Sequence, residues 1–362
     1  MRILHVITTL QIGGAERLMV DLLPLLQEMG NEVDLLLFNG FESCFKNELS
    51  HKNIRIFSSK KDNKKSKFKV YNPLNIFKLR KYLKRYDIIH THNTACQVYA
   101  PIAKLLSRSK PILVTTEHNS TGRRRSLKWF RPIDRWVYGQ YDAIVCIADQ
   151  TRINFEKHIG RKEGVYTIYN GIDTSRFDCP IKDVMGQKDF VITMVAGFRP
   201  QKDQDTLLRA VKCLPDNYRL QFVGEGDRED ELKQMCNQMR LGERVTFLGV
   251  RMDVPEIMRD SDILVLSSHW EGLSLASIEG MASGRPFIAS DVDGLREMVD
   301  GAGVLFPEGD EEALANSIQQ LCENPALYRE VATACQKRAK EYDISVMAEG
   351  YHNLYKSLLE QS

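Results

Sequence analysis

Short apolar runs rich in Ile and Val alternate with longer amphipathic stretches along the whole chain. The runs predict strands at residues 3–8, 33–38, 54–57, 87–90, 112–115, 143–147, 165–168, 190–195, 220–223, 245–248, 263–266, 287–289 and 304–306. Helical periodicity lies between them, for example at 203–213, 228–239 and 311–322. Because a parallel strand needs a connection long enough to hold a helix, this alternation predicts parallel sheets with crossover helices.

The alternation runs through both halves of the chain, so we expect an α/β protein with two Rossmann-like, doubly wound domains. A polar stretch at 173–189 has no clear period and marks the boundary. We therefore place an N-terminal domain at 1–175, a C-terminal domain at 176–343 and a last amphipathic helix at 344–362. Ligands of open parallel sheets bind beyond the carboxyl ends of the strands, so two such domains facing each other would share one cleft.

The charge of the chain is divided unevenly between its halves. Residues 1–170 carry 29 Lys and Arg against 15 Asp and Glu, a net charge of +14, whereas the remainder carries 21 against 33, a net charge of −12. Such a division is expected of two domains with different surroundings.

The eight Cys form no C-x-x-C pair, so we expect reduced thiols. With no leader and no membrane-length apolar run, the sequence predicts a cytoplasmic protein.

Two turns with glycine follow predicted strands. Gly13 and Gly14 precede a helix, where adjacent glycines let the backbone approach a phosphate and the helix offers free N–H groups. A tight turn without a ligand would explain the same pair. In the second half, Gly197 is followed by Arg199, which presents a planar fork, and by Lys202, which presents a compact charge; together they would neutralise a diphosphate. The alternative for these two cations is solvated surface charge.

The most specific pattern is a pair of carboxylates, Glu271 and Glu279, eight positions apart around a turn that leads into a helix. Gly272, Leu273 and Ser274 would supply free N–H groups at the start of that helix, where a phosphate binds favourably. The carboxylates on either side would accept hydrogen bonds from hydroxyls. A surface helix with unrelated glutamates is the alternative, although the small residues that follow indicate close packing; they are Gly280, Ala282, Ser283 and Gly284.

The segment E-G-L-S-L-A-S-I-E-G-M-A-S-G-R-P at 271–286 resembles the Glu-x7-Glu signature of glycosyltransferase family 4, a retaining family with the GT-B fold. Other segments match the family in the same order. They are the glycine loop at 13–14, the strand-end histidine motif T-E-H-N at 116–119, N-G-I-D at 170–173, V-G-E-G at 223–226 and F-L-G-V at 247–250. The pattern G-R-x-x-x-K also matches, but Phe198 is interposed between Gly197 and Arg199.

The resemblance implies roles for residues across the chain. Arg199 and Lys202 would hold the donor diphosphate, Glu271 would accept from hydroxyls of the transferred sugar, and His118 would sit against that sugar. These four form the expected catalytic group. The expected donor-binding residues are Gly13, Gly14, Asn170, Gly197, Val250, Arg251, Gly272, Leu273, Ser274 and Glu279. Among them, Glu279 would accept from the ribose hydroxyls and the backbone near Val250 and Arg251 would meet the base. The last helix would cross back onto the N-terminal domain.

The resemblance also implies a reaction. A sugar would move from a nucleoside-diphosphate sugar, most commonly a UDP-sugar in this family, to a hydroxyl of a saccharide or polyprenyl-linked acceptor, in surface polysaccharide or glycoconjugate synthesis. Front-face departure of the diphosphate and double displacement through Glu271 both remain open. Asp291 and Asp293 have the spacing of a metal-binding pair, but they follow a late strand and are more typical of a loop. We therefore expect no cofactor and no metal.

Other functions fit parts of the sequence. A nucleotide-sugar epimerase uses the same architecture, and a non-catalytic binder of nucleotide sugars or nucleic acid would explain the basic segments but not the motifs of the second half. A dinucleotide oxidoreductase would need a G-x-G-x-x-G fingerprint, which is missing. We expect no nucleic-acid partner.

Basic residues of the first half suggest an anionic membrane surface as a further partner, which would make the protein peripheral on the inner face of the membrane. The basic residues are Lys60, Lys61, Lys64, Lys65, Lys67, Lys69, Arg123, Arg124, Arg125, Lys128 and Arg131. Aromatic residues follow, with Trp129 and Phe130 inside the basic run and Trp136 after it. Alternatively, the aromatic residues belong to a helix core and the cations are solvated, or the cations bind a negatively charged soluble acceptor.

Overall fold

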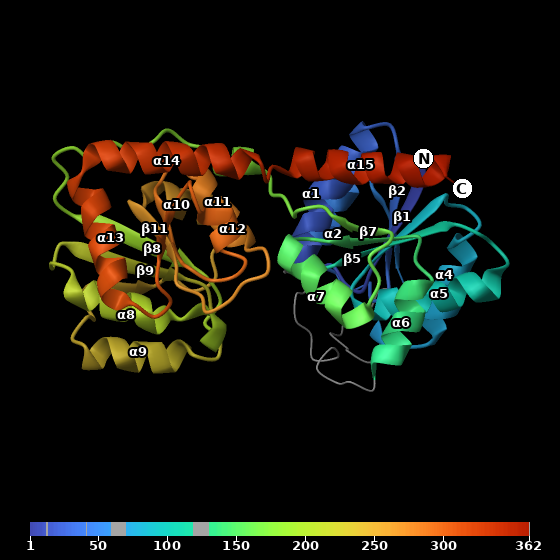
Figure 1. Ribbon diagram of the computed structural model, residues 1–362, viewed down its shortest axis with the longest axis horizontal. Coiled ribbons are helices and arrows are strands. Elements are labelled where there is room, and N and C mark those ends of the chain that lie inside the picture. Colours follow the sequence, from blue (N-terminus) through green and yellow to red (C-terminus); the bar gives the residue numbers. More distant parts are fainter. Residues whose placement is uncertain (12–13, 41, 59–69, 119–129, 362) are drawn as a thin grey trace. The chain divides into compact units, whose positions relative to one another are not determined.

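The computed structural model describes residues 1–11, 14–40, 42–58, 70–118 and 130–361 (Figure 1). The chain forms two compact units: unit 1 comprises Met1–Gly171 and Ile344–Ser362, and unit 2 comprises Ile172–Asp343. Each unit contains one parallel sheet with helices on both faces, as the alternation of the sequence predicted. Among the described residues, every helix is too short or too polar to cross a membrane.

The sheet of unit 1 has the strand order of a doubly wound fold. Across the sheet its strands are β3 (Arg55–Ser58), β2 (Glu32–Leu37), β1 (Arg2–Ile7), β4 (Ile88–His92), β5 (Ile112–Glu117), β6 (Ala143–Cys146) and β7 (Val165–Thr167). The helices are α1 (Gly14–Glu28), α2 (Cys44–His51), α4 (Leu74–Tyr82), α5 (Thr94–Ser107), α6 (Arg131–Gly139), α7 (Asp149–Ile159) and α15 (Ile344–Glu360).

Successive residues of a strand point to opposite faces, and the central strands of unit 1 bury both. In β1, Ile3 and Ile7 pack with α1 and α15, whereas Leu4 and Val6 pack on the other face with α4, α5, α6 and α7. The last helix, α15, therefore completes unit 1, as the resemblance implied. Two of its tyrosines, Tyr351 and Tyr355, are buried against the sheet.

The sheet of unit 2 has the same kind of order. Its strands are β10 (Val245–Phe247), β9 (Tyr218–Val223), β8 (Phe190–Val195), β11 (Ile263–Leu266), β12 (Phe287–Ser290) and β13 (Val304–Phe306). The helices are α8 (Gln204–Cys213), α9 (Glu229–Gln238), α10 (Val254–Asp260), α11 (Leu275–Ala282), α12 (Arg296–Val299), α13 (Glu311–Glu323) and α14 (Pro325–Lys340), and the short 3-10 turns are η2 (Thr174–Arg176) and η3 (Pro200–Lys202).

The boundary between the units lies between Gly171 and Ile172, four residues before the predicted division at 175/176. The backbone N–H of Ile172 donates to the carbonyl of Tyr342, and Phe177 and Val184 are buried in the core of unit 2. The polar stretch at 173–189 therefore belongs to unit 2. Its few apolar residues are isolated among polar ones, so periodicity alone did not reveal their burial.

Candidate active site

The turn after β8 carries Arg199 and Lys202, and a buried phenylalanine fixes it. Phe198 is 1% exposed, and its ring packs edge-on against Phe222 and Phe247, with centroids 6.0 and 5.9 Å apart. Arg199 is exposed at the start of η3, and Lys202 ends that turn. The residue interposed in the G-R-x-x-x-K pattern is therefore a core residue that anchors the loop from beneath.

The V-G-E-G segment supports this turn from the neighbouring strand β9. A side chain at Gly224, which has φ +141°, would bring Cβ to 2.2 Å from the carbonyl oxygen of Ala196. The amide of Phe198 donates to the carbonyl of Glu225 at 3.0 Å. Only glycine allows the two loops to approach this closely, because any Cβ at that position would clash with backbone.

Glu271 lies in the loop after β11, where it pairs with Lys202. Lys202 Nζ lies 2.5 Å from Glu271 Oε1, and the side chains are 18% and 8% exposed. Ser268 Oγ donates to the same carboxylate oxygen at 2.6 Å, and Gln201 Nε2 donates to the carbonyl of Trp270 at 2.7 Å. The structure therefore brings together two residues that the sequence predicted to be catalytic, from loops 69 positions apart.

A glycine that the sequence analysis did not assign to the site lies beneath Glu271. A Cβ on Gly294, which has φ +83°, would lie 2.4 Å from the carbonyl oxygens of Glu271 and Gly272. The amide of Glu271 donates to the carbonyl of Asp293 at 3.3 Å, and Asp291 pairs with Arg296. The D-V-D segment therefore forms a loop that supports Glu271, which agrees with its interpretation as a loop.

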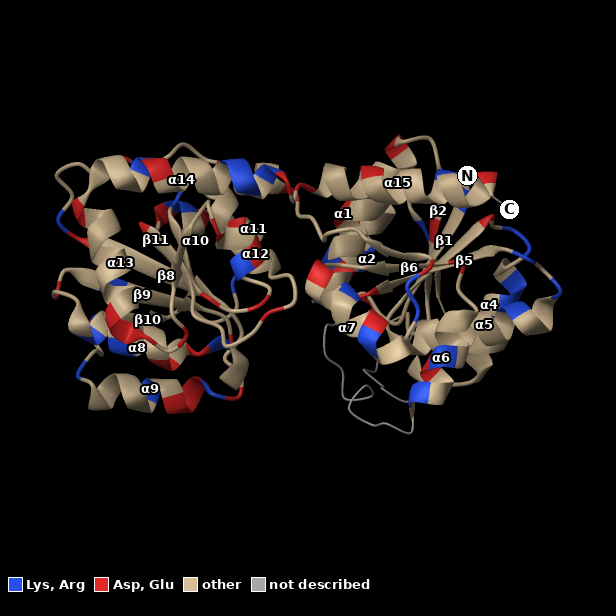
Figure 2. Ribbon diagram, viewed as in Figure 1, with Lys and Arg blue, Asp and Glu red and all other residues tan. Residues whose placement is uncertain are grey.

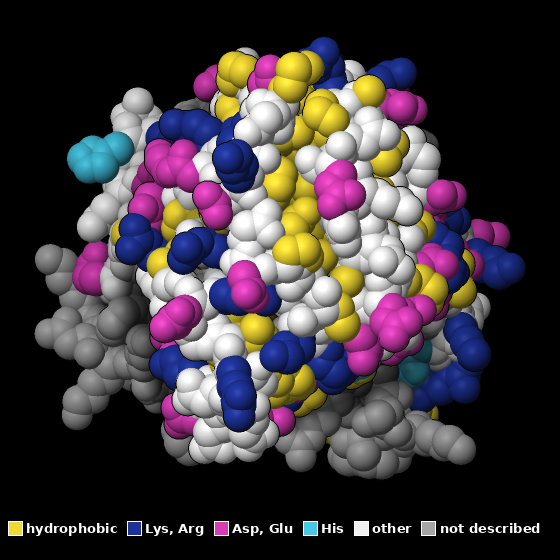
Figure 3. All heavy atoms as spheres, turned by 90° about the vertical axis from the view of Figure 1, so that its left-hand side faces the viewer, with side chains coloured by type: hydrophobic (Ala, Val, Ile, Leu, Met, Phe, Trp, Pro, Cys, Tyr) yellow, Lys and Arg dark blue, Asp and Glu magenta, His cyan; other side chains and the backbone are white. Residues whose placement is uncertain are grey.

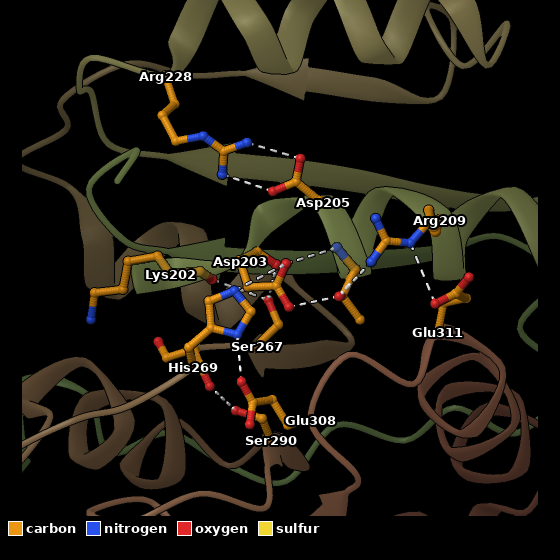
Figure 4. A network of polar contacts seen from close by, with 12 residues as sticks. Lys202, Asp203, Asp205, Arg209, Arg228, Ser267, His269, Ser290, Glu308 and Glu311 are labelled. Carbon is orange, nitrogen blue, oxygen red and sulfur yellow. Dashed lines mark hydrogen bonds and ion pairs between the residues drawn. The ribbon is translucent and has the colours of Figure 1, made fainter. Parts of the chain in front are cut away.

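Further polar contacts hold the ends of β8, β11 and β13 together (Figure 4). Asp203, which has φ +44°, caps α8 by accepting from the Thr206 amide at 3.3 Å, and it also accepts from the Thr206 hydroxyl at 2.6 Å. Ser267 Oγ donates to the carbonyl of Asp203 at 2.8 Å. His269 lies between Asp203 and Glu308, with Nδ1 2.7 Å from Glu308 Oε1. This network fixes the loops that carry Lys202 and Glu271.

Helix α11 begins at Leu275, directly after the predicted phosphate-binding amides. The Ser274 hydroxyl is its N-cap and accepts from the Ser277 amide at 3.3 Å, so Gly272 and Leu273 precede the helix. Glu279, the fifth residue of the helix, is partly buried. Its contact with a ribose remains a prediction.

The remaining residues expected to bind the donor lie in several environments. Val250 and Arg251 are exposed after β10, and Arg251 pairs with Asp253 at 2.5 Å. Asn170 is buried, and its Oδ1 has no hydrogen-bond partner among the described residues. Gly197 follows β8, and Gly14 begins α1. Gly13 lies outside the described residues, as do Asn119, the six lysines at 60–69 and the basic residues at 123–128.

Arg131 and the aromatic residue Trp136 of the proposed membrane surface are described on α6. Arg131 donates to the carbonyls of His158 and Lys157 at the end of α7, and is therefore occupied as a helix cap. Trp136 is 45% exposed, which contradicts the alternative that it is a core residue of its helix.

His118 follows β5 in unit 1 and belongs to a buried group of histidines. Its Nε2 lies 3.1 Å from Nδ1 of His92, whose Nε2 lies 3.0 Å from Nδ1 of His5. Burial lowers the pKa of His118 to about 4 and that of His5 to about 3, so both rings are neutral at pH 7. His5 and His92 were not predicted from the sequence; His92 lies at the end of β4, but His5 lies within β1, where no local pattern marks it.

A third buried histidine, His90, stands beside His5 and His92, and ring nitrogens of the three lie within 4.8 Å of one another. The nitrogens of His90 have other partners: Nδ1 lies 2.5 Å from the Tyr355 hydroxyl and Nε2 2.8 Å from Thr116 Oγ1. Hydrogen bonds thus account for five of the six ring nitrogens of this trio, and the sixth is His5 Nε2.

Known families match both units. The model of Glycosyltransferase Family 4 matches residues 12–176, and that of Glycosyl transferases group 1 matches residues 181–342. The chain belongs to glycosyltransferase family 4. The enzyme is 27% identical over 318 residues to the putative glycosyltransferase EpsD of Bacillus subtilis (strain 168), covering 80% of this chain and 83% of that protein. It is 29% identical over 280 residues to the UDP-Gal:alpha-D-GlcNAc-diphosphoundecaprenol alpha-1,3-galactosyltransferase of Escherichia coli, covering 70% of each.

Solved structures show the same fold. Anabaena Alr3699/HepE, in complex with UDP and glucose, matches this transferase with a TM-score of 0.83 at 23% identity, over 99% of this chain and 100% of that one. The transferase therefore has the GT-B fold that the sequence predicted. The family models and the named relatives favour sugar transfer over both the epimerase and the non-catalytic binder.

Proposed function

We propose that the enzyme is a retaining glycosyltransferase that moves a sugar from a UDP-sugar to a hydroxyl of a lipid-linked saccharide, in the synthesis of a surface polysaccharide or glycoconjugate. The observation that carries this proposal is the ion pair of Lys202 and Glu271 at adjoining strand ends of unit 2. The names of two similar proteins support the substrate classes: the Escherichia coli protein is named for UDP-Gal and a diphosphoundecaprenol acceptor, and the Anabaena structure holds UDP.

On donor binding, Lys202 and Glu271 separate and each takes a partner on the donor. A donor diphosphate carries more negative charge than one carboxylate and draws the compact Lys202 ammonium away from Glu271. Arg199, exposed on the same turn, offers the diphosphate a bidentate fork. Glu271 keeps the hydrogen bond from Ser268 and accepts a second one from a hydroxyl of the sugar. The free enzyme thus holds both groups in place until the donor arrives.

Transfer breaks the bond between the anomeric carbon and the diphosphate oxygen and forms a bond to the acceptor oxygen on the same face of the sugar. UDP leaves with the electron pair, and Arg199 and Lys202 stabilise its growing charge. A phosphate oxygen takes the proton of the incoming hydroxyl. Double displacement would instead use Glu271 as the nucleophile. The hydrogen bond from Ser268 stabilises the negative charge of the Glu271 carboxylate, and Glu271 would lose that charge on attacking the sugar as a nucleophile. We therefore propose the front-face route.

We propose that no metal is needed, because the two cations of the β8 turn supply the positive charge that a bridging metal would supply. Chelation with EDTA should leave the transfer rate unchanged. A rate that falls on chelation and returns on addition of Mg²⁺ or Mn²⁺ would refute metal independence without touching the rest of the proposal.

The decisive test is a screen of nucleotide sugars by thermal shift, followed by transfer assays with those that bind. A donor at 100 times its Kd stabilises the folded enzyme by about 2.7 kcal/mol. We expect UDP and one UDP-sugar to stabilise it, and a labelled sugar to pass to a lipid-linked saccharide with its anomeric configuration kept. Inverted product, or release of the epimer of the free sugar in place of transfer, would refute the proposed reaction.

A further inference from the structure

His5, His92 and His118 form an unbroken line of hydrogen bonds that no assigned role explains. Their contacts, His5 Nδ1 to His92 Nε2 at 3.0 Å and His92 Nδ1 to His118 Nε2 at 3.1 Å, link three neighbouring strands. His5 lies within β1, His92 ends β4, and His118 directly follows β5. His5 and His92 have no exposed surface, and His118 is partly buried. The positions of the ring protons of His5 and His92 are therefore set by these partners and not by water.

The direction of the line follows from its buried end. Each contact needs one N–H donor and one lone pair, so the three neutral rings can be arranged in only two ways. In the first arrangement His5 Nε2 carries a proton, and in the second arrangement it carries a lone pair. This atom is buried and has no partner among the described residues. An unpaired buried N–H is rarer than an unpaired acceptor, so the second arrangement is favoured.

The second arrangement sets every proton along the line. His5 donates from Nδ1 to His92, which accepts at Nε2 and carries its own proton on Nδ1. His92 in turn donates to Nε2 of His118. The lone pair on Nε2 of His118 thus accepts the hydrogen bond from His92, and the ring proton of His118 is on Nδ1. Burial also lowers the pKa of His92 well below its usual value, so a neutral ring is expected at each position.

We propose that His92 and His5 are positioning residues that lock His118 in the tautomer protonated at Nδ1. The inference rests on the proposed function only in that His118 meets the donor sugar. In this tautomer His118 offers the sugar an N–H donor and no free lone pair. It can hold an oxygen of the sugar in place, but it cannot act as a general base. This assignment also fits the front-face route, in which the proton of the acceptor goes to a phosphate oxygen.

The tautomer can be measured in the free enzyme by NMR with histidine labelled with ¹⁵N in the ring, with the His118 signals assigned from a His118→Gln variant. We expect His118 to have a protonated Nδ1 and a bare Nε2. In His92→Leu, which removes the donor, both tautomers of His118 should appear. His92→Asn keeps an N–H near the position of Nδ1 and should restore the single tautomer. His90→Asn is the matched control, an equally buried histidine on the same face of β4, and should leave the His118 signals unchanged.

Kinetics give an independent readout of the positioning role. His92→Leu should lower kcat by about 10- to 100-fold, since a misplaced contact to the reacting sugar is that costly. The Kd of UDP should stay unchanged, and His92→Asn should recover most of the loss. A fall in UDP affinity to match the fall in kcat would mean general damage and would overturn the positioning role.

Several results would overturn the tautomer lock whether or not the enzyme transfers sugars. They are a proton on Nε2 of His118 in the wild-type enzyme, a cationic ring at pH 7, or a stoichiometric metal ion in the purified protein bound to His5, His90 and His92. If His92→Leu does not fold, the wild-type and His92→Asn spectra still decide the matter. If the tautomer is as inferred but no nucleotide sugar is a donor, the lock stands and the proposed function fails.

Discussion

Glu271 and Glu279 belong to one signature but lie in different surroundings. Glu271 is buried and hydrogen-bonded to Ser268 and Lys202, whereas Glu279 is partly buried on α11. We expect Glu279→Ala to weaken UDP binding by about 1.5–3 kcal/mol, the usual cost of losing a charged hydrogen-bond partner. Glu271→Ala should spare UDP binding, or even tighten it by freeing Lys202, and suppress transfer. Isothermal calorimetry with UDP measures both, and equal losses of affinity would contradict the two roles.

The cations of the β8 turn should act mainly on the transition state, because charge grows on the diphosphate as the bond breaks. We expect Arg199→Ala and Lys202→Ala to lower kcat as well as raise KM. Lys212→Ala, which removes an exposed lysine near the end of α8, serves as the control and should change neither. Steady-state kinetics with the identified donor test this. An unchanged kcat in both variants would show that the cations only hold the donor or do not touch it.

At the scale of elements, the strands were predictable because apolar runs dominate them. The predicted ranges at 190–195, 263–266 and 304–306 coincide with β8, β11 and β13. The prediction for β4 ended at His90, whereas the strand continues to His92. Thr91 and His92 are polar and were not included in the predicted strand, although both are fully buried. The hydrogen-bonded line of His5, His92 and His118 was therefore not predicted, because the polar partners that allow each histidine to be buried lie on other strands.

The candidate site shows the same limit. Its Arg, Lys and Glu residues follow from local motifs, so the sequence predicted them. Gly294 supports Glu271 from a loop 23 positions away, and Phe198 anchors the turn through contacts with two other strands. Neither relation leaves a periodic signal, because each depends on which loops the folded sheet places together.

Helix α15 is joined to the sheet of unit 1 by two tyrosine hydroxyls. Tyr355 contacts His90 Nδ1 at 2.5 Å, and Tyr351 contacts Thr116 Oγ1 at 2.9 Å. Tyr355→Phe leaves a buried ring nitrogen without a partner, so we expect it to destabilise the protein by about 1–3 kcal/mol. Tyr166→Phe is the matched control, because that residue is 37% exposed. Urea unfolding measures both, and equal small effects would show that the α15 contact contributes little.

At the scale of the whole molecule, the buried histidines make stability depend on pH. Burial lowers the folded-state pKa of His5 to about 3 and that of His118 to about 4, below the ordinary value of about 6.5. The unfolded chain therefore binds more protons between these values, so stability falls as pH drops below about 6.5 and is level above it. Each such histidine contributes up to about 1.4 kcal/mol per pH unit. Urea midpoints at pH 7, 6 and 5 should decline, and less steeply in His5→Asn; equal midpoints would contradict this.

Charge is also divided between the units, which bears on where the proposed lipid-linked acceptor would be met. Unit 2 is acidic, and Figure 3 shows both signs of charge interspersed on the side where α13 lies. Unit 1 is basic, and Figure 2 shows Lys and Arg along α4. Leu74 and Phe77 of α4 are 60% and 52% exposed, next to exposed cations. These cations are Arg80 and Lys81 on α4, and Lys84 and Arg85 shortly after its end. Helix α4 therefore combines exposed apolar and basic side chains, as a membrane interface requires.

We predict that unit 1 docks on anionic membranes through α4 together with the basic segments at 60–69 and 123–128. Each basic residue near such a surface contributes about 1 kcal/mol, and the attraction fades within a Debye length. Sedimentation with liposomes should therefore show binding that rises with the fraction of anionic lipid and falls in high salt. Lys81→Glu with Lys84→Glu should weaken it, while Lys212→Glu on unit 2 should not. Because α4 supplies apolar contacts as well, Phe77→Ser should weaken binding even in low salt. Binding that does not depend on the fraction of anionic lipid, or that is unchanged in high salt, would refute electrostatic docking. A negatively charged soluble acceptor would then be the explanation of the basic residues.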